Sequence, residues 1–328
     1  MIAIFGHALR RGAAAAAAIV ALALPAVAAD PPVLTVGTLG GGTVAWELET
    51  IKTHDFDTAN GFKLETQDFA GNPATQVALQ GGAVDAIVTD WVWAAQAMAG
   101  GLDLSFIPYS TAVGGLLVAG DSPAQNLADL KGRKIAVSGS PLDKTWVILR
   151  ALGMKQGFDL AAETEQVFAA PPLVMQAALS GEAQGAINIW NMAAKMKVAG
   201  MRELISVADA ATELGLDPDM PLLGYAVSRK AVADKPEVLA GLARASRAAK
   251  DLLATDDAAW EALRPMMNAD NDAEFEALRE GWRAGIPPAG PVNAEVAGKL
   301  FSVLAEVGGR ELTGGLTALP EGLFDPVE

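Results

Sequence analysis

The feature that most constrains the fold is a strand–helix–strand unit between residues 66 and 93. A turn at Phe69–Pro73 leads into a short helix, in which proline suits the first position and Gly81 marks the end. The apolar run Val84–Val88 follows without alternation, as expected of a strand covered on both faces. Ligands of open α/β sheets bind beyond the carboxyl ends of their strands. The unit therefore predicts a helix-covered sheet with a binding site close to Thr89–Trp91.

The second half of the chain repeats this plan. Pro172–Leu179 is expected as a helix closed by Gly181, and Gly185–Ile189 as a strand followed by Trp190. Each of the two apolar strands thus leads directly into a tryptophan, which is Trp91 in the first case. Because the match occurs at equivalent places, it indicates two lobes of similar build.

Strands and helices alternate through both halves, and helices alone follow residue 236. This alternation predicts an α/β fold in which each half forms a Rossmann-like, helix-covered sheet. We expect lobe one to comprise residues 30–119 and 222–328, with the C-terminal helices packed back on it, and lobe two residues 120–221. The expected strands cover residues 33–37, 62–66, 84–88, 103–109, 115–119, 135–138, 164–168, 185–189 and 220–228, and the C-terminal helices residues 236–254, 256–267, 272–283 and 293–307.

Residues 1–29 have the composition of a secretory signal peptide. Arg10 and Arg11 supply the positive start, Ala13–Leu24 the apolar core, and Ala26–Ala29 a small-residue cleavage site. The apolar core is short for a membrane span, and the chain has no cysteine that could carry a lipid. We therefore expect ordinary secretion to the periplasm, which leaves 299 of the 328 residues in the mature chain.

The composition excludes several classes of function. Without Arg10 and Arg11, 22 basic residues stand against 39 acidic ones, and the net charge of −17 argues against nucleic acids and anionic membranes as partners. The absence of cysteine excludes disulfides, thiolate metal sites and cysteine nucleophiles. His54 is the only histidine expected in the mature chain, so histidine metal sites and Ser-His-Asp catalysis lack their residues. We expect no metal, no cofactor and no enzymatic activity.

Three segments carry a resemblance to a known family. They read DLKGRKIAVSGSPLDKTWVILRALG, MQAALSGEAQGAINIW and LLGYAVSRKAVADKPEVL, in this order along the chain. Together with Gly82–Ala86 they resemble periplasmic substrate-binding proteins of the nitrate/taurine/sulfonate and thiamine-precursor class of ABC transporters, over most of residues 33–265. One departure is Gln184-Gly185, where the family commonly has Val-Asp. The opening VGTLGGGT also resembles the glycine turn of TRAP-associated receptors, so that receptor class stays open as an alternative.

The resemblance implies a bilobal, type II periplasmic-binding-protein fold with a hinge and a ligand cleft. A protein of this kind closes on a small solute, acts as a monomer and delivers the solute to the membrane permease of an ATP-driven importer. The sequence does not identify the solute.

The candidate ligand-binding residues lie where strands end and helices begin. Backbone N–H groups at such places can bind an anion, and a tryptophan can stack on a flat ligand. Each position also has a structural explanation, such as a turn that needs positive φ, a helix cap or a buried ring. The candidates are Gly41, Gly42, Thr43, Asn72, Asp90, Trp91, Ser138, Ser140, Thr145, Asn188, Trp190 and Tyr225.

The charges near these positions leave the ligand chemistry open. The candidate loops contain no arginine, and Lys144 is the nearest lysine. A sulfonate or nitrate would therefore be held by backbone amides, hydroxyls and helix dipoles. Asp90 and the aromatic side chains suit a flat neutral or cationic solute equally well.

Two other functions compete with a solute receptor. A lyase or precursor synthase on the same fold would need a general base, and Asp90 is the only good candidate for that role. A periplasmic accessory protein would instead hold a partner protein. The near absence of histidine and cysteine and the two similar lobes favour the receptor.

Overall fold

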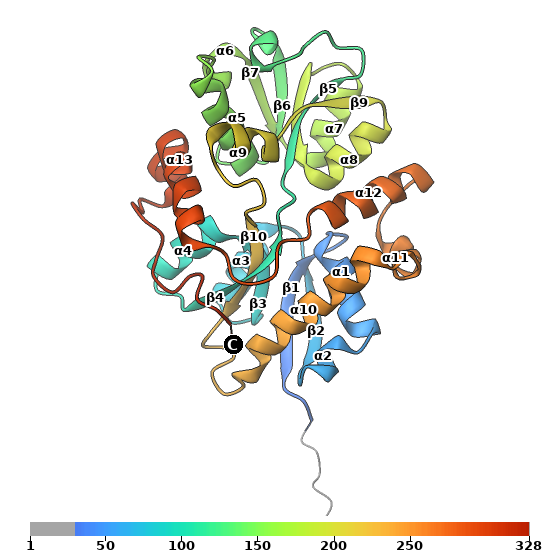
Figure 1. The fold of residues 1–328 in the computed structure, drawn as a ribbon, viewed down its shortest axis with the longest axis vertical. Helices are drawn as coiled ribbons and strands as arrows, with labels where there is room; N and C mark the ends of the chain where they lie inside the picture. Colours follow the sequence, from blue (N-terminus) through green and yellow to red (C-terminus); the bar gives the residue numbers. More distant parts are fainter. Residues whose placement is uncertain (1–29, 328) are drawn as a thin grey trace, which may run out of the picture. The chain divides into compact units, whose positions relative to one another are not determined.

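The computed structural model describes residues 30–327, so the expected signal peptide lies outside the described residues. Between residues 31 and 327 the chain forms two five-stranded sheets with helices around each sheet (Figure 1). This arrangement is the α/β fold with two lobes that the sequence predicts. Within residues 30–327, no helix has the combined length and apolar character that crossing a membrane requires.

The first sheet has the strand order β2-β1-β3-β10-β4. Strands β1, β2 and β3 run parallel, whereas β10 enters from the second half of the chain and pairs antiparallel with both β3 and β4. The strands are β1 (Val33–Leu39), β2 (Lys63–Phe69), β3 (Ala86–Asp90), β4 (Leu104–Ser110) and β10 (Leu223–Ser228), and the helices between them α1 (Val44–Thr53), α2 (Phe56–Ala59), α3 (Asn72–Gln80) and α4 (Trp91–Ala99).

The second sheet repeats this topology with the order β7-β6-β8-β5-β9. Here β6, β7 and β8 run parallel and β5 is the antiparallel strand, so the two lobes share one plan as the repeated sequence unit predicts. The strands are β5 (Gly114–Ala119), β6 (Lys134–Ser138), β7 (Glu165–Ala169), β8 (Gly185–Ile189) and β9 (Met201–Ser206), and the helices are a 3₁₀ turn (Leu127–Leu130), α5 (Lys144–Lys155), α6 (Leu160–Glu163), α7 (Pro171–Leu179), α8 (Trp190–Val198) and α9 (Val207–Leu214).

The position of the first crossover corrects the predicted lobe boundary. The sequence places residues 115–119 in lobe one, but β5 pairs with β8 and β9 of the second sheet. The chain therefore passes between the sheets at residues 111–113, directly after β4. An apolar strand pairs equally well with either sheet, so its own sequence does not reveal its partners.

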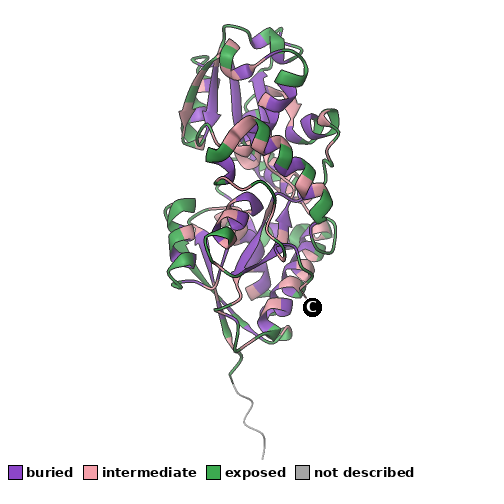
Figure 2. Cartoon of the chain, turned by 90° about the vertical axis from the view of Figure 1, so that its left-hand side faces the viewer, coloured by how far each residue is buried: buried purple, intermediate pink, exposed green. Residues whose placement is uncertain are grey.

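The strand β3 shows why its residues Ala86–Val88 are all apolar. Ile87 packs into one buried cluster, whereas Ala86 packs into another on the opposite face of the sheet. Helices cover both faces, and Figure 2 shows buried residues concentrated in the strands of each sheet. Both faces must therefore be apolar, as the sequence predicts.

The C-terminal helices contact both lobes, whereas the sequence predicts that they pack on lobe one alone. Helix α10 packs on α1, but α12 packs along α8 and α13 along α5, which belong to the second sheet. Lys195 of α8 and Glu274 of α12 form an ion pair at 3.1 Å, which reinforces the contact between these two helices. The helices are α10 (Glu237–Thr255), α11 (Asp257–Leu263), a 3₁₀ turn (Arg264–Met266), α12 (Asp272–Ala284) and α13 (Ala294–Thr313), the last with a kink at Gly309.

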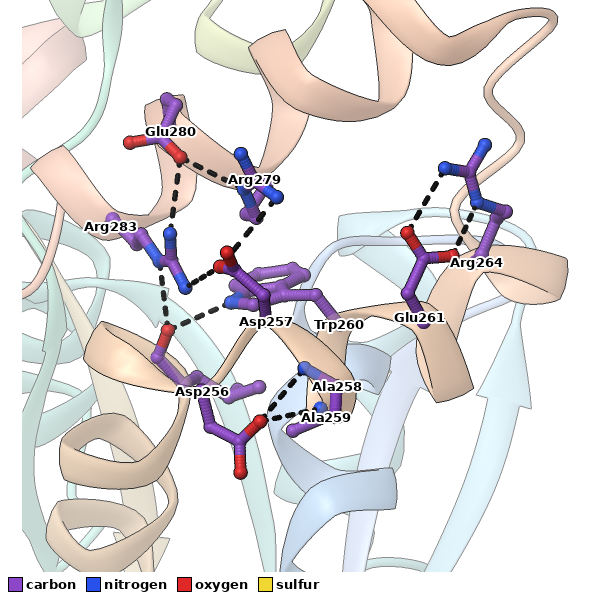
Figure 3. Close-up of polar contacts among 11 residues, drawn as sticks. Asp256, Asp257, Ala258, Ala259, Trp260, Glu261, Arg264, Arg279, Glu280 and Arg283 are labelled. Carbon is purple, nitrogen blue, oxygen red and sulfur yellow. Dashed lines mark hydrogen bonds and ion pairs between the residues drawn. The ribbon is translucent and has the colours of Figure 1, made fainter.

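Charged side chains join α11 to α12 (Figure 3). Asp257 in the first turn of α11 pairs with Arg283 of α12 at 2.7 Å and with Arg279 at 3.6 Å. Arg283 also donates to the carbonyl of Leu253, which accepts a second bond from the indole of Trp260 at 2.7 Å. The hydrogen bond from Arg283 holds the pKa of Asp257 below its ordinary value. These contacts fix the end of α10 and the two helices that follow it.

A buried ionic cluster, formed by Glu47, Tyr225, Ser246 and Lys250, fixes α1 against α10 and β10. Lys250 donates to Glu47 at 2.6 Å, and the hydroxyl groups of Ser246 and Tyr225 donate to the same carboxylate at 2.6 and 2.9 Å. Glu47 is 0% and Lys250 2% exposed, so each charge depends on the other for its solvation. The carboxylate thus accepts three hydrogen bonds, two from α10 and one from β10.

Removing one charge of this pair is expected to cost more than removing both. Lys250→Met leaves the charge of Glu47 buried without its cation, and we expect the free energy of unfolding to fall by about 3–5 kcal/mol. In the double variant Glu47→Gln/Lys250→Met no charge is buried, and the loss should be clearly smaller than the sum of the two single losses. Urea denaturation of the wild type, both single variants and the double variant measures the coupling. Additive losses would contradict the pairing.

Candidate functional site

A cavity of about 340 Å³, partly open to solvent, lies where strands of both sheets end and helices begin. We call it the cleft cavity. Residues of β1, β3, α1 and α3 line it from the first lobe, and residues of α5 and α8 from the second. Its polar side chains are Thr38, Thr43, Asn72, Thr75, Thr89, Asp90, Asp143, Lys144, Thr145 and Asn191, and its larger apolar ones Leu39, Val44, Val88, Val113, Ile189, Trp190, Leu222 and Leu223.

Half of the candidate residues line the cleft cavity, and they come from both lobes. The first lobe supplies four of them and the second lobe two. The structure thus brings together strand ends that lie far apart in the sequence, as expected for sheets whose carboxyl ends face one another. The six residues are Gly42, Thr43, Asn72, Asp90, Thr145 and Trp190.

Two aromatic candidates lie in the core of the first lobe instead. Trp91 is fully buried and packs edge-on against Phe324, with 6.1 Å between the ring centroids. Tyr225 is also fully buried, and its hydroxyl belongs to the buried ionic cluster. Neither ring reaches the cavity, which corrects the expectation that Trp91 stacks on a ligand there and that Tyr225 reaches it from the hinge.

The other four candidates lie near the cavity without lining it. Asn188 is buried, and its side-chain amide donates to the carbonyl of Pro171 at 3.0 Å, which ties β8 to α7. Ser138 is buried at the end of β6, while Ser140 is exposed and accepts a hydrogen bond from the N–H of Leu142. Gly41 precedes the lining residue Gly42 and has a positive φ of 73°.

Several lining residues were not among the candidates, and they include three threonines and one acid. Asp143 is the N-cap of α5, accepting from the N–H of Trp146 at 3.1 Å, so the helix begins at Lys144. Aspartate is among the preferred N-cap residues, and this preference could have located the helix start. Thr38, Thr75 and Thr89 carried no comparable signal.

Helices that start at the cavity fall into two groups. Helices α4 and α5 are capped by the carboxylates of Asp90 and Asp143. Helices α1, α3 and α8 start at Thr43, Gly71 and Ile189, and none of these residues makes a side-chain cap. Part of the first turn is already used, since Ala45 and Trp46 of α1 donate to the carbonyls of Gly42 and Thr43, Ala74 of α3 donates to that of Gly71, and Pro73 has no N–H. The remaining N–H groups, such as those of Val44 and Asn72, are free to bind a ligand, and the helix dipole favours negative charge there.

One ion pair joins the two lobes across the cavity. Lys144 of the second lobe donates to Asp90 of the first at 2.8 Å, and both side chains are largely buried. The second oxygen of Asp90 accepts the N–H of Trp93 at 3.0 Å. The adjacent Asp143 has a raised pKa, chiefly because burial disfavours its charged form, and Asp90 adds to the effect while Lys144 opposes it. The cavity therefore contains two carboxylates and one ammonium group.

Trp190 is the candidate aromatic side chain that the structure places in the cavity. It extends from α8 and packs edge-on against Trp46 of α1, with 6.1 Å between the centroids. On its other side lies Gly281 of α12, where an added Cβ atom would stand 3.0 Å from the indole ring. Contacts with the first lobe and with α12 thus hold this second-lobe ring in place.

The segment between the lobes is fixed by the end of α12. Ser110 and Thr111 both donate to the carbonyl of Gly285, at 3.2 and 3.0 Å. A Cβ atom at Gly285 would lie 2.6 Å from that of Ala112, so only glycine permits this approach.

Among residues 30–327, no group of three or more His, Asp or Glu side chains could hold a metal ion.

The fold and the cleft cavity define a bilobal binding-protein architecture, and the comparisons with known proteins agree. The chain belongs to the NMT1/THI5-like family, whose model matches residues 59–259. This match confirms, at the level of the family, the resemblance that the sequence carries. No curated protein sequence matches the chain significantly.

Solved structures share the fold at low sequence identity. The aliphatic sulphonate-binding protein SsuA from Escherichia coli has a TM-score of 0.71 at 19% identity, covering 91% of this chain and 94% of that chain. The alkanesulfonate-binding protein SsuA from Xanthomonas axonopodis pv. citri, bound to MOPS, has a TM-score of 0.64 at 20% identity, with coverages of 90% and 97%. The desulfurization enzyme DSZB has a TM-score of 0.56 at 17% identity, with coverages of 89% and 95%.

The raised pKa of Asp143 predicts a pH-dependent cost in stability. Above that pKa the folded protein carries a buried carboxylate, whose cost disappears as the pH falls through the folded pKa towards the ordinary value of 3.8. Asp143→Asn keeps a good N-cap without the charge. We therefore expect the variant to have the higher melting temperature at pH 7 and the difference to close as the pH falls.

Melting curves of both proteins between pH 4 and pH 7, in steps of about half a pH unit, measure this difference. Asp159→Asn is the matched control, because Asp159 caps α6 away from the cavity. A difference that stays constant over the range would contradict the assignment.

Proposed function

We propose that the protein is a periplasmic receptor that binds a small organic or oxyanion ligand in the cleft cavity and delivers it to an ABC importer. Family membership and the fold that it shares with sulfonate-binding proteins support this function. The observation that carries the proposal is the convergence of the uncapped helices α1, α3 and α8, from both lobes, on one cavity. Neither lobe alone offers this arrangement.

The cavity favours an organic molecule that carries an oxyanion group. The three uncapped helix starts provide the positive potential that an oxyanion needs, since the ammonium group of Lys144 is already paired with Asp90. The side chains of Val44, Val113 and Trp190 provide an apolar wall for the rest of the molecule. A bare nitrate ion would leave most of the 340 Å³ to water, whereas ligand pockets of about 300–1000 Å³ typically hold a complete organic ligand.

The carboxylates of Asp90 and Asp143 add negative charge to the same cavity. Asp90 is occupied by Lys144 and by the N–H of Trp93, and Asp143 by the N–H of Trp146. An amino group on the ligand could approach these acids while its oxyanion group lies at the uncapped helix starts. Zwitterionic sulfonates such as MOPS are therefore suitable probes.

A catalytic function has less support. DSZB shows that the fold can carry an enzyme, and one of its solved structures is a cysteine-to-serine mutant. This chain contains no cysteine. His54 is exposed at the C-terminal end of α1, opposite the end that lines the cavity. The lining of the cavity contains neither a cysteine nor a histidine, so we propose a receptor without catalysis.

The location and the partner belong to the same proposal. Several solved proteins with this fold are described as components of ABC import systems, which favours an ABC permease over a TRAP transporter as the partner. We propose that the chain acts as a monomer in the periplasm after removal of residues 1–29.

A thermal-shift screen of the unfolded and refolded protein, freed of co-purified ligand, tests the function. The panel contains MOPS, ethanesulfonate, nitrate, a hydroxymethylpyrimidine, ethylamine and acetate. We expect the organic sulfonates to respond most strongly, since a ligand at about 100 times its dissociation constant stabilises by roughly 2.7 kcal/mol. A response limited to ethylamine would contradict the oxyanion assignment, and no response at all would contradict the solute receptor.

Matched tryptophan variants test the site by calorimetric titration with the responding ligand. Trp190→Ala removes the aromatic wall of the cavity, and we expect affinity to fall by about tenfold or more. Trp93→Ala makes the same change outside the cavity and should leave affinity unchanged. Equal affinities of the Trp190→Ala variant and the wild type would place the ligand elsewhere.

A further inference from the structure

The cleft cavity contains a direct ionic contact between the two lobes, formed by Asp90 and Lys144. Asp90 is the last residue of β3 in the first sheet, and Lys144 is the first residue of α5 in the second lobe. The ammonium nitrogen and the carboxylate oxygen lie 2.8 Å apart, and the side chains are 24% and 16% exposed. The function proposed above assigns no role to this pair.

The pair differs from the other ion pairs that residues 30–327 form. Most of those join residues of the same lobe, or join the C-terminal helices to one another or to the first lobe. Two ion pairs connect the second lobe to the rest of the described chain. They are Lys195–Glu274 between α8 and α12, and Lys144–Asp90 in the cavity. Of these two, the Lys144–Asp90 pair is the one that reaches a strand of the first sheet.

Both partners are held in position by the start of a helix. One oxygen of Asp90 accepts the N–H of Trp93 at 3.0 Å and caps α4, which leaves the other oxygen for Lys144. Asp143 fixes the start of α5 in the same way, because it accepts the N–H of Trp146. Only the flexible stem of Lys144 can adjust when one lobe moves against the other. The contact therefore exists only in lobe arrangements close to the one described.

A second carboxylate makes the loss of the ammonium group unfavourable. Asp143 precedes Lys144 and lines the same cavity. Burial is the main cause of its raised pKa, and the charge of Asp90 raises that pKa further while the charge of Lys144 lowers it. All three groups thus interact. Without Lys144, carboxylates from the two lobes would repel each other in surroundings that screen charge less than bulk water does.

We infer that the Asp90–Lys144 pair is an inter-lobe clasp, which fixes the arrangement of the lobes around the cavity and opposes their separation. A partly buried ion pair adds little net stability, but it can select one arrangement of the groups that it joins. In a receptor the clasp slows the lobe opening that accompanies ligand exchange, and this consequence rests on the proposed function. The clasp itself is measured without a ligand, so a silent ligand screen would not affect the test.

Spin labels on the two lobes measure their separation directly. The chain has no cysteine, so Ala59→Cys on α2 and Ala162→Cys on α6 create two unique labelling sites. Both alanines are exposed and lie outside the lining of the cavity. Double electron–electron resonance then gives the distribution of distances between the labels. The mature chain is first unfolded and refolded to remove co-purified ligand, and no ligand is added.

The variants separate the charge of the pair from its other contacts. We expect Lys144→Met to shift the distances to longer values and to broaden their distribution, whereas Lys144→Arg keeps the charge and should resemble the wild type. Asp90→Asn keeps a good N-cap for α4 and should shift the distances in the same direction as Lys144→Met. The double variant Asp90→Asn/Lys144→Met should shift no further than Lys144→Met alone, because the pair can be broken only once.

Arg150→Met is the matched control. It breaks the pair of Arg150 with Asp159, whose side chains are 22% and 35% exposed and both belong to the second lobe, and it should leave the distances unchanged. An unchanged distribution in the Lys144→Met variant would overturn the clasp. Additive shifts from Asp90→Asn and Lys144→Met, or an equal shift in the Arg150→Met variant, would also overturn it. A cooperative melting curve shows that each variant is folded.

Discussion

The parallel strands of both sheets must be covered on two faces, and the rest of the molecule follows from this constraint. Ala86 and Ile87 are adjacent in β3 and pack into separate cores on opposite sides of the sheet. Helices supply that cover, and each helix that follows a parallel strand begins at the carboxyl end of the strand. Helix starts from the two lobes therefore meet at one cavity. The binding site is a consequence of covering the sheets.

Buried contacts fix the helix starts once they have met. Glu47, one turn inside α1, is held by Lys250, and the hydroxyl of Tyr109 donates to the carbonyl of Thr43 at the beginning of the same helix. Trp282 of α12 in turn donates to Tyr109 at 3.3 Å. The C-terminal helices thus hold the α1 side of the cavity and, through α8 and α5, the second lobe as well. Any movement between the lobes must change the packing of α12 and α13.

Structural features that depend on the local sequence pattern can be predicted from the sequence. Features that depend on packing against residues far away in the chain cannot. The strand–helix alternation, the two similar lobes and the strand ends at the cavity follow from local apolar runs and glycine turns. Trp91 and Trp190 occupy equivalent positions, and each begins a helix after a central strand. Phe324 packs against the ring of Trp91, whereas Gly281 leaves room for that of Trp190. No pattern near either tryptophan reveals residues so far away in the chain. The partners of β5 were missed for the same reason.

The central claim is that one ligand contacts both lobes at the helix starts. Hydrogen–deuterium exchange with and without saturating MOPS tests it most directly, because exchange is measured separately for each segment. The account predicts that residues 42–46 and 72–75 of the first lobe become protected together with residues 143–146 and 190–193 of the second. Protection confined to one lobe, or absent from all four segments, would contradict it.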